Sequence, residues 1–280
     1  MKKIFLALAF FAATAVHAQN DNEDGAFNHL SVGVTLGTTG IGFELGTTIS
    51  PHFGLRAGYE FMPNFTVKNT FEYDRPKALN NVPPELLKER YVDIPEYGAK
   101  IDAKGSPLLK QGNVLVDIFP GTKSSFHFTV GAYFGKEEIV SLKAADKTIA
   151  AVELYNSDIK NGYIKAEPQY PNGIYVDFEG YQMGSESMNQ GRVELDLKTN
   201  SFRPYVGVGF GRTVPRSTIG CRFDFGVEFI GKLKLYDKYR DHEITKDEPG
   251  ISSDFKDVLK VLGGIPVYPS LKLSIVGKIL

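Results

Sequence analysis

The fold of this 280-residue chain is decided by residues 219–229, which read IGCRFDFGVEF. Apolar side chains occupy every second position from Ile219 to Phe229, and the positions between them carry glycine or a charge. A two-residue period is the period of a β-strand whose two faces meet different surroundings. This stretch therefore predicts a strand with one apolar face and one face that carries Arg222, Asp224 and Glu228.

The same alternation recurs on both sides of this stretch. It is clear in seven further runs and weaker in two, which gives ten predicted strands with residues 219–229 included. The clear runs are Leu30–Leu36, Ile41–Ile49, Phe53–Phe61, Phe126–Phe134, Val193–Leu197, Val206–Phe210 and Leu271–Ile279, and the weaker ones are Val114–Phe119 and Ile174–Tyr181. Glycine-rich, aromatic-rich chains of many short strands are typical of sandwiches and barrels. We expect an all-β, antiparallel up-and-down barrel of ten strands, with eight as the alternative number.

The lengths of the connections support an even strand number, which single-chain bacterial barrels have. If the first strand runs outward, the long connections Pro63–Gly112, Gly135–Gly173 and Asp237–Tyr268 all lie at the outer end. The inner connections, such as Ser50–His52, are then short. This arrangement keeps the weak strand Ile174–Tyr181, because omitting it alone leaves an odd number of strands.

The charged face indicates which way the strands point. A charge that faces lipid at the bilayer midplane costs roughly 2–4 kcal/mol. The apolar faces are therefore predicted to meet lipid, and the glycines to leave room in a narrow polar interior. A soluble periplasmic sandwich or barrel is the rival, in which Phe223 and Phe225 would point inward. The lumen charge network is predicted to contain Glu44, Arg56, Glu60, Arg192, Glu194, Asp196, Arg222, Asp224 and Glu228.

The first residues read as an export signal. Lys2 and Lys3 precede the apolar run Ile4–Val16, and small residues favour cleavage before Gln19. We expect a signal peptide over residues 1–18, a disordered N-terminus over residues 19–28 and a barrel domain over residues 29–280. Beyond the signal, no stretch approaches 18 uninterrupted apolar residues.

Two short helices are predicted within the long connections. One follows Pro83-Pro84 and covers Glu85–Glu89, because proline is favoured at the start of a helix. In the other, Ser253 caps Asp254–Leu262 and Gly263-Gly264 ends the helix. Its apolar face is expected to pack on the barrel rim.

Composition and motifs exclude several functions. The 32 basic residues balance 33 acidic ones, which argues against a nucleic-acid partner. A single cysteine, Cys221, cannot form an internal disulfide. His29, His52, His127 and His242 are scattered and form no metal-binding pair. We predict no catalytic residue, no metal and no cofactor, and His127 is expected to be a hydrogen-bonded residue of the lumen.

Two segments carry a family resemblance. Residues 268–280, YPSLKLSIVGKIL, and residues 202–212, FRPYVGVGFGR, are similar to strands of outer-membrane β-barrels. The last 90 or so residues resemble the small, mostly uncharacterised outer-membrane barrels of Bacteroidota-type bacteria. Such chains usually end in Phe, whereas this one has Leu280. The resemblance implies insertion into the outer membrane by the barrel-assembly machinery, with outer-membrane lipid and lipopolysaccharide as surroundings.

Three functions follow for such a barrel. Because side chains fill the interior of an eight-stranded barrel and ten strands enclose little more, we expect a plugged or very narrow lumen. The first hypothesis is a non-enzymatic structural or ligand-binding role through the outer loops. The alternative is a narrow pore for ions or small solutes, and the third hypothesis is a lipid-modifying outer-membrane enzyme.

Overall fold

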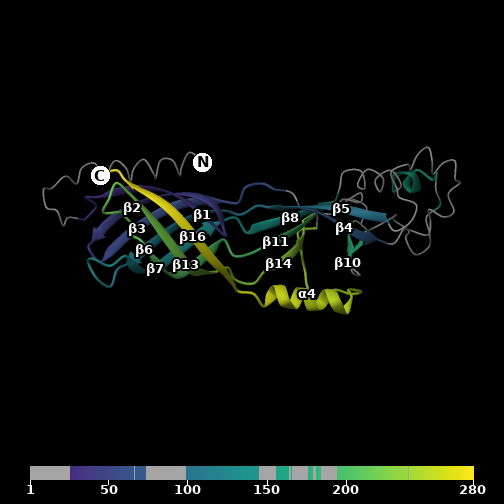
Figure 1. Cartoon of the computed structure of the whole chain (residues 1–280). Helices are drawn as coiled ribbons and strands as arrows, with labels where there is room; N and C mark the ends of the chain where they lie inside the picture. Colours follow the sequence, from purple (N-terminus) through teal and green to yellow (C-terminus); the bar gives the residue numbers. More distant parts are fainter. Residues whose placement is uncertain are drawn as a thin grey trace.

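Eight strands form a closed antiparallel barrel, in the order β1-β16-β13-β12-β7-β6-β3-β2 (Figure 1). The computed structural model describes residues 26–65, 67–73, 99–144, 156–163, 165, 176–178, 181–183, 194–238 and 240–280. The barrel strands are β1 (Leu30–Gly37), β2 (Gly40–Ser50), β3 (Phe53–Phe61), β6 (Lys110–Ile118), β7 (Phe126–Gly135), β12 (Phe202–Phe210), β13 (Ile219–Phe229) and β16 (Val267–Lys278).

A second, six-stranded sheet stands beyond one end of the barrel, and we call it the outer sheet (Figure 1). Its strand order is β15-β14-β11-β8-β5-β4. The strands are β4 (Val67–Tyr73), β5 (Ala99–Pro107), β8 (Glu138–Ala144), β11 (Glu194–Lys198), β14 (Lys234–Asp237) and β15 (His242–Ile244). The strands β9 (Val176–Phe178) and β10 (Tyr181–Met183) pair separately, and residues 156–160 form a helical turn.

The side chains of the barrel strands point as the charge argument requires. In β13, Phe223 and Phe225 are 47% and 50% exposed, whereas Arg222 and Asp224 are 1% and 2% exposed. The other barrel strands show the same division, with an exposed apolar residue on each outer face. Examples are Val34, Phe43, Tyr59, Val114, Phe128, Val206 and Leu273. An apolar belt around a charged interior is the arrangement of a membrane-spanning barrel, in which every strand also finds its hydrogen-bond partners.

The connections divide the barrel into an inner and an outer end. Residues 51–52, 119–125 and 211–218 join strands at the inner end, where both β1 begins and β16 ends. The segments 62–109, 136–201 and 230–266 join strands at the outer end and contain the outer sheet. Only the β1–β2 hairpin at Thr38-Thr39 is short at that end.

The number of barrel strands is eight, the alternative to the expected ten. Val193–Leu197 corresponds to β11 of the outer sheet, and Ile174–Tyr181 contains β9, which pairs only with β10 among the described residues. The alternation in β11 has another cause than lipid, since its apolar residue Leu195 packs in the protein core of the outer sheet. The lengths of β11 and β9 are five and three residues, whereas a strand needs about 9–11 residues to cross the membrane.

The predicted helix at Ser253 forms, with two differences from the prediction. Helix α4 covers Ser253–Gly263 and is capped by Ser252, whose side chain accepts from the Phe255 amide. It packs on the outer sheet rather than on the barrel rim, since Phe255 belongs to the apolar cluster of that sheet. Residues 1–25 and the predicted helix Glu85–Glu89 lie outside the described residues. No helix in the described part of the chain is long and apolar enough to cross a membrane.

Candidate functional site

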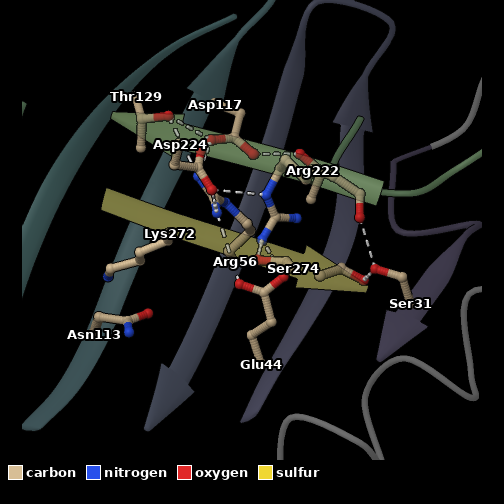
Figure 2. A network of polar contacts seen from close by, with 12 residues as sticks. Ser31, Glu44, Arg56, Asn113, Asp117, Thr129, Arg222, Asp224, Lys272 and Ser274 are labelled. Carbon is tan, nitrogen blue, oxygen red and sulfur yellow. Dashed lines mark hydrogen bonds and ion pairs between the residues drawn. The ribbon is translucent and has the colours of Figure 1, made fainter. Parts of the chain in front are cut away.

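The barrel interior holds two layers of polar side chains. The layer nearer the inner end, shown in Figure 2, is centred on Arg56 of β3. Arg56 Nη2 lies 2.6 Å from Asp117 Oδ1, and its Nη1 lies 3.1 Å from Asp224 Oδ2 and 3.6 Å from Glu44 Oε2. Arg222 Nε lies 3.1 Å from Asp224 Oδ2, and Arg222 also donates to Glu44. Each carboxylate in this layer therefore contacts at least one guanidinium.

The remaining contacts of the inner layer come from two threonine hydroxyls and an imidazole. Thr129 Oγ1 donates to Asp117 Oδ1 over 2.9 Å, and Thr213 Oγ1 donates to Asp117 Oδ2 over 2.5 Å. His127 Nε2 lies 3.0 Å from Asp224 Oδ1. A buried charge is tolerated only when it is paired and hydrogen-bonded. These contacts meet that condition for the carboxylates and join β13 to the four consecutive strands β7, β6, β3 and β2. Among the described residues, Arg56 Nε and Arg222 Nη1 are buried without a hydrogen bond.

Asp117, His127 and Asp224 also form a cluster of metal-ligand type, with ligand atoms within 4.8 Å of one another. Arg56, however, donates to both carboxylates of this cluster. A metal ion there would have to displace a guanidinium that already neutralises them. The cluster is therefore accounted for as part of the charge network.

The layer nearer the outer end is built around Lys272 of β16. Lys272 Nζ lies 2.5 Å from Glu60 Oε1, donates to the Tyr133 hydroxyl, and stands 4.2 Å from the centre of the Tyr133 ring. Gln111 Nε2 donates to Glu228, and Arg203 Nη1 donates to Gln111 Oε1 over 2.7 Å. Asn113 and Thr39 complete the contacts of Glu60.

Glycines make space for the large side chains of the lumen. A Cβ atom on Gly226 would lie 2.3 Å from the Tyr205 hydroxyl and 2.4 Å from Cζ of its ring. On Gly209 it would lie 2.5 Å from His127 Nε2. Tyr205 in turn packs edge-to-face on Tyr133, with ring centres 5.4 Å apart. The interior of an eight-stranded barrel is just wide enough for side chains to fill, and here aromatic rings occupy the space that glycine leaves.

The turn formed by residues 211–218 closes the inner end. Thr213 is 2% exposed, and its carbonyl accepts from Ser31 Oγ over 2.8 Å while its hydroxyl reaches Asp117. A Cβ atom on Gly54 would lie 2.1 Å from Thr213 Oγ1. The turn therefore folds into the barrel mouth and contacts both β1 and β3.

Six of the nine predicted network residues lie in the lumen. They are Glu44, Arg56, Glu60, Arg222, Asp224 and Glu228, each at most 9% exposed. Glu194 and Asp196 lie instead in β11 of the outer sheet, because that strand does not belong to the barrel. Arg192 falls outside the described residues.

The sequence prediction missed further members of the network. Asp117 and Gln111 lie on β6, and Lys272 lies on β16. The alternation along each strand could have identified them. Asp117 stands between Val116 and Ile118, and Lys272 stands between Leu271 and Leu273, so both polar side chains fall on the inward face.

The outer sheet has a core of the opposite kind. Tyr181, Leu195, Leu235, Ile244, Ile251 and Phe255 form one buried apolar cluster there. At its border, Glu194 Oε1 lies 2.7 Å from Lys143 Nζ and 2.6 Å from Lys238 Nζ. Burial alone would raise the pKa of Glu194, but the hydrogen bonds and charges of these two lysines outweigh it and hold the pKa below its ordinary value.

The fold and the filled, charged interior define the chain as a transmembrane antiparallel β-barrel. In structure it is similar to CarO2 of Acinetobacter baumannii, with 17% identity, a TM-score of 0.45, and coverage of 92% of this chain and 100% of that chain. CarO of the same organism is 14% identical, with a TM-score of 0.42, and the alignment covers 88% of this chain and 96% of that chain. A major outer membrane protein from Thermus thermophilus is 12% identical, with a TM-score of 0.38, and the alignment covers 89% of this chain and 99% of that chain. No protein-family model and no curated protein matches the sequence.

Proposed function

We propose that this chain is an outer-membrane protein whose plugged barrel anchors the outer sheet as a binding surface outside the cell. The observation that carries the proposal is the continuity between the two parts. The strands β7 and β8 are separated by residues 136–137 alone, and β11 and β12 by residues 199–201. Backbone hydrogen bonds join the segments that connect the barrel to the outer sheet, from Leu108 N to Ile139 O and from Asn200 N to Ile230 O. The outer sheet is therefore a stiff extension of the barrel wall.

The filled lumen supports an anchoring role over a diffusion pore. Tyr133, Asp117 and His127 are 0% exposed, and Arg56 and Tyr205 are 2% exposed. Ion conduction needs a wet path from end to end, and these side chains occupy the cross-section of the barrel in two successive layers. The turn at Thr213 adds a third obstruction at the inner end.

A non-enzymatic role is part of the same proposal. His127 is fully buried and lies against Asp224 inside the barrel wall, where no substrate reaches it. In the outer sheet, His242 Nε2 lies 2.6 Å from Glu248 Oε1 at the surface. Unchanged lipid chemistry in a strain that lacks the protein is the expected result, and mass spectrometry of extracted lipid A and phospholipids measures it.

Single-channel recording tests the plug. The refolded protein is added to a planar bilayer in potassium chloride, and we expect no steady conductance. Steady, repeatable current steps would contradict the plug and favour the narrow pore. A general diffusion porin added to the same bilayer is the positive control, because opening the outer layer of this barrel alone would leave the inner layer and the Thr213 turn in place.

Labelling of intact cells tests which end is displayed. Lys246 is exposed in the outer region, and Lys123 is exposed in an inner turn. In a Cys221→Ser background, Lys246→Cys should react with a membrane-impermeant maleimide on intact cells, while Lys123→Cys should react only after lysis. The reverse pattern would invert the proposed orientation, and equal labelling would contradict a membrane location.

A further inference from the structure

A cavity of about 300 Å³ lies across the inner mouth of the barrel. All three inner turns, the inner ends of β2 and β16, and His29 just before β1 contribute to its lining, so it lies across the barrel axis rather than on the lipid-facing wall. Its polar lining includes Arg212, Arg216, Lys278, His29, Ser50 and Thr122. The outer-sheet binding role does not involve this cavity, which faces the opposite side of the membrane.

The charged side chains at this end are of one sign. In the inner-end segments that the structure describes (26–29, 51–52, 119–125, 211–218 and 279–280), there is no aspartate or glutamate. Arg212, Arg216 and Lys278 form no salt bridge with any described residue, since the lumen carboxylates pair with Arg56, Arg222 and Lys272 instead. Three cations thus line one cavity without an acidic partner in the described part of the chain.

Two of these cations are held close together by the backbone. Arg212 Nη1 donates to the carbonyls of Thr122 and Ser124 over 2.9 and 3.0 Å, and its Nη2 donates to that of Pro51 over 3.1 Å. Arg216 Nη2 donates to the same Thr122 carbonyl over 3.0 Å. Burial, together with the neighbouring charge of Arg216, lowers the pKa of Arg212. An anion placed between the two guanidinium groups would relieve this repulsion.

We propose that the cavity binds a small oxyanion, a phosphate or carboxylate group, from the periplasmic solution. Guanidinium groups match the geometry of both oxyanions, and charge-assisted hydrogen bonds to them are among the strongest available to a protein. The ammonium of Lys278 and the hydroxyls of Ser50 and Thr122 supply further donors around the same space. Fixing Arg212 through three carbonyls sets the position of the anion before it binds.

The test is a titration of the refolded full chain in nanodiscs of neutral phosphatidylcholine, with inorganic phosphate and with succinate as separate probes. Backbone NMR shifts at Thr122 and Arg216 report on the site. We expect saturable shifts for at least one probe. The double variant Arg216→Glu, Lys278→Glu should bind about tenfold or more weakly, because two charge-assisted contacts become repulsive. Arg212 is left intact because it also holds the inner turns together.

The control is Lys123→Glu, which reverses one charge at the same end but outside the cavity lining, as each substitution of the double variant reverses one charge within it. It should leave the affinity within about twofold, since exposed charges are well screened at physiological salt. An equal loss in the control would overturn the proposal in favour of diffuse attraction, and so would the absence of saturable shifts. A response only in nanodiscs with phosphatidylglycerol would overturn the assignment to a dissolved ligand. Heat-modifiable gel migration must show that each variant is folded.

Three acids, Asp21, Glu23 and Asp24, precede the described residues. The titration is therefore repeated with Asp21→Asn, Glu23→Gln and Asp24→Asn, so that these acids do not contribute to the shifts. Saturable binding that persists in both proteins supports an external oxyanion, whereas binding that disappears in the substituted protein would overturn it.

Discussion

Inside the barrel, the buried positions carry Arg56, Asp117 and Asp224, whereas in the outer sheet they carry Leu195, Leu235 and Phe255. Both regions are antiparallel sheets with the same two-residue alternation. They differ in what surrounds their apolar faces, because those of the barrel meet lipid and those of the outer sheet pack on one another and on α4, with acidic residues such as Glu194, Asp196 and Asp237 also buried there. One chain therefore stabilises its two halves by opposite means, a hydrogen-bonded charge network in one and apolar burial in the other.

The largest effect is expected where the charge network is broken at its centre. Arg56→Met leaves Asp117 and Asp224 without their main partner, and breaking a buried ion pair on one side costs roughly 3–5 kcal/mol. The free energy of unfolding in urea should fall by about that amount. Because the chain has no tryptophan, far-UV circular dichroism and gel migration are the suitable measurements. The control is Arg216→Met, at an exposed arginine, which should change the free energy of unfolding by less than about 0.5 kcal/mol. Equal stability of Arg56→Met and the natural protein would show that the network contributes nothing.

A core truncation in the outer sheet should act on that region alone. Phe255→Ala removes the anchor of α4 and should destabilise the outer sheet by about 3 kcal/mol. Limited proteolysis is then expected to cut residues 240–262 faster, while the heat-modifiable migration of the barrel stays unchanged. Val258→Ala is the control, since Val258 is 50% exposed on the same helix. Loss of barrel stability in Phe255→Ala would mean that the two regions unfold together.

A smaller effect is expected from filling the space that glycine leaves. Gly226→Ala forces a Cβ atom against Tyr205, which Tyr133 holds in place, and overpacking of this kind costs roughly 1–3 kcal/mol. Gly112→Ala is the matched control, because its Cβ atom would meet nothing closer than a backbone oxygen at 3.7 Å. Urea unfolding compares the two. A Gly226→Ala barrel as stable as the control would show that the lumen has unfilled room.

The smallest effect is expected at Glu194, the charged border of the outer sheet. Its pKa is lowered in the folded protein, so its contribution is present at neutral pH and is lost as the pH falls below its ordinary value of 4.5. Because Lys143 and Lys238 are about half exposed, the contribution is under about 1 kcal/mol. Glu194→Gln should speed amide exchange in β11 at pH 7, and this effect should be smaller at pH 3, because the carboxylate becomes protonated as the pH falls. An equal effect at both pH values would assign it to packing rather than to charge.

The sequence predicts the barrel well where long strands alternate without interruption. The runs at Phe126, Val206, Ile219 and Leu271 correspond to β7, β12, β13 and β16. Alternation could not separate β11 from these strands, because a strand that packs one face on a protein core has the same period as one that packs it on lipid. Strand length carries the distinction, since β11 has five residues and β13 has eleven.

Members of the lumen charge network could be predicted where they lie on strongly alternating strands, and less well where the alternation is weak. Arg222 and Asp224 stand out between phenylalanines, whereas Asp117 follows an inward Leu115 on a weaker strand. Which charges pair could not be read from the sequence, because Arg56 meets Asp117 on the neighbouring strand β6, 61 residues away, and Asp224 across the lumen, 168 residues away. The closure of the inner end by Thr213 depends on a turn whose sequence shows no alternation.

The ring is closed by its first and last strands, with Ser31 opposite Lys278. Until β16 is in place, β1 and β13 each keep an edge with unpaired backbone groups, which the lipid interior cannot satisfy. The chain therefore gains little from inserting one strand at a time. Its last strand, β16, must pair with β1 and β13 before the barrel can close. Losing even that short segment should leave a chain that aggregates through its open strand edges instead of entering the membrane.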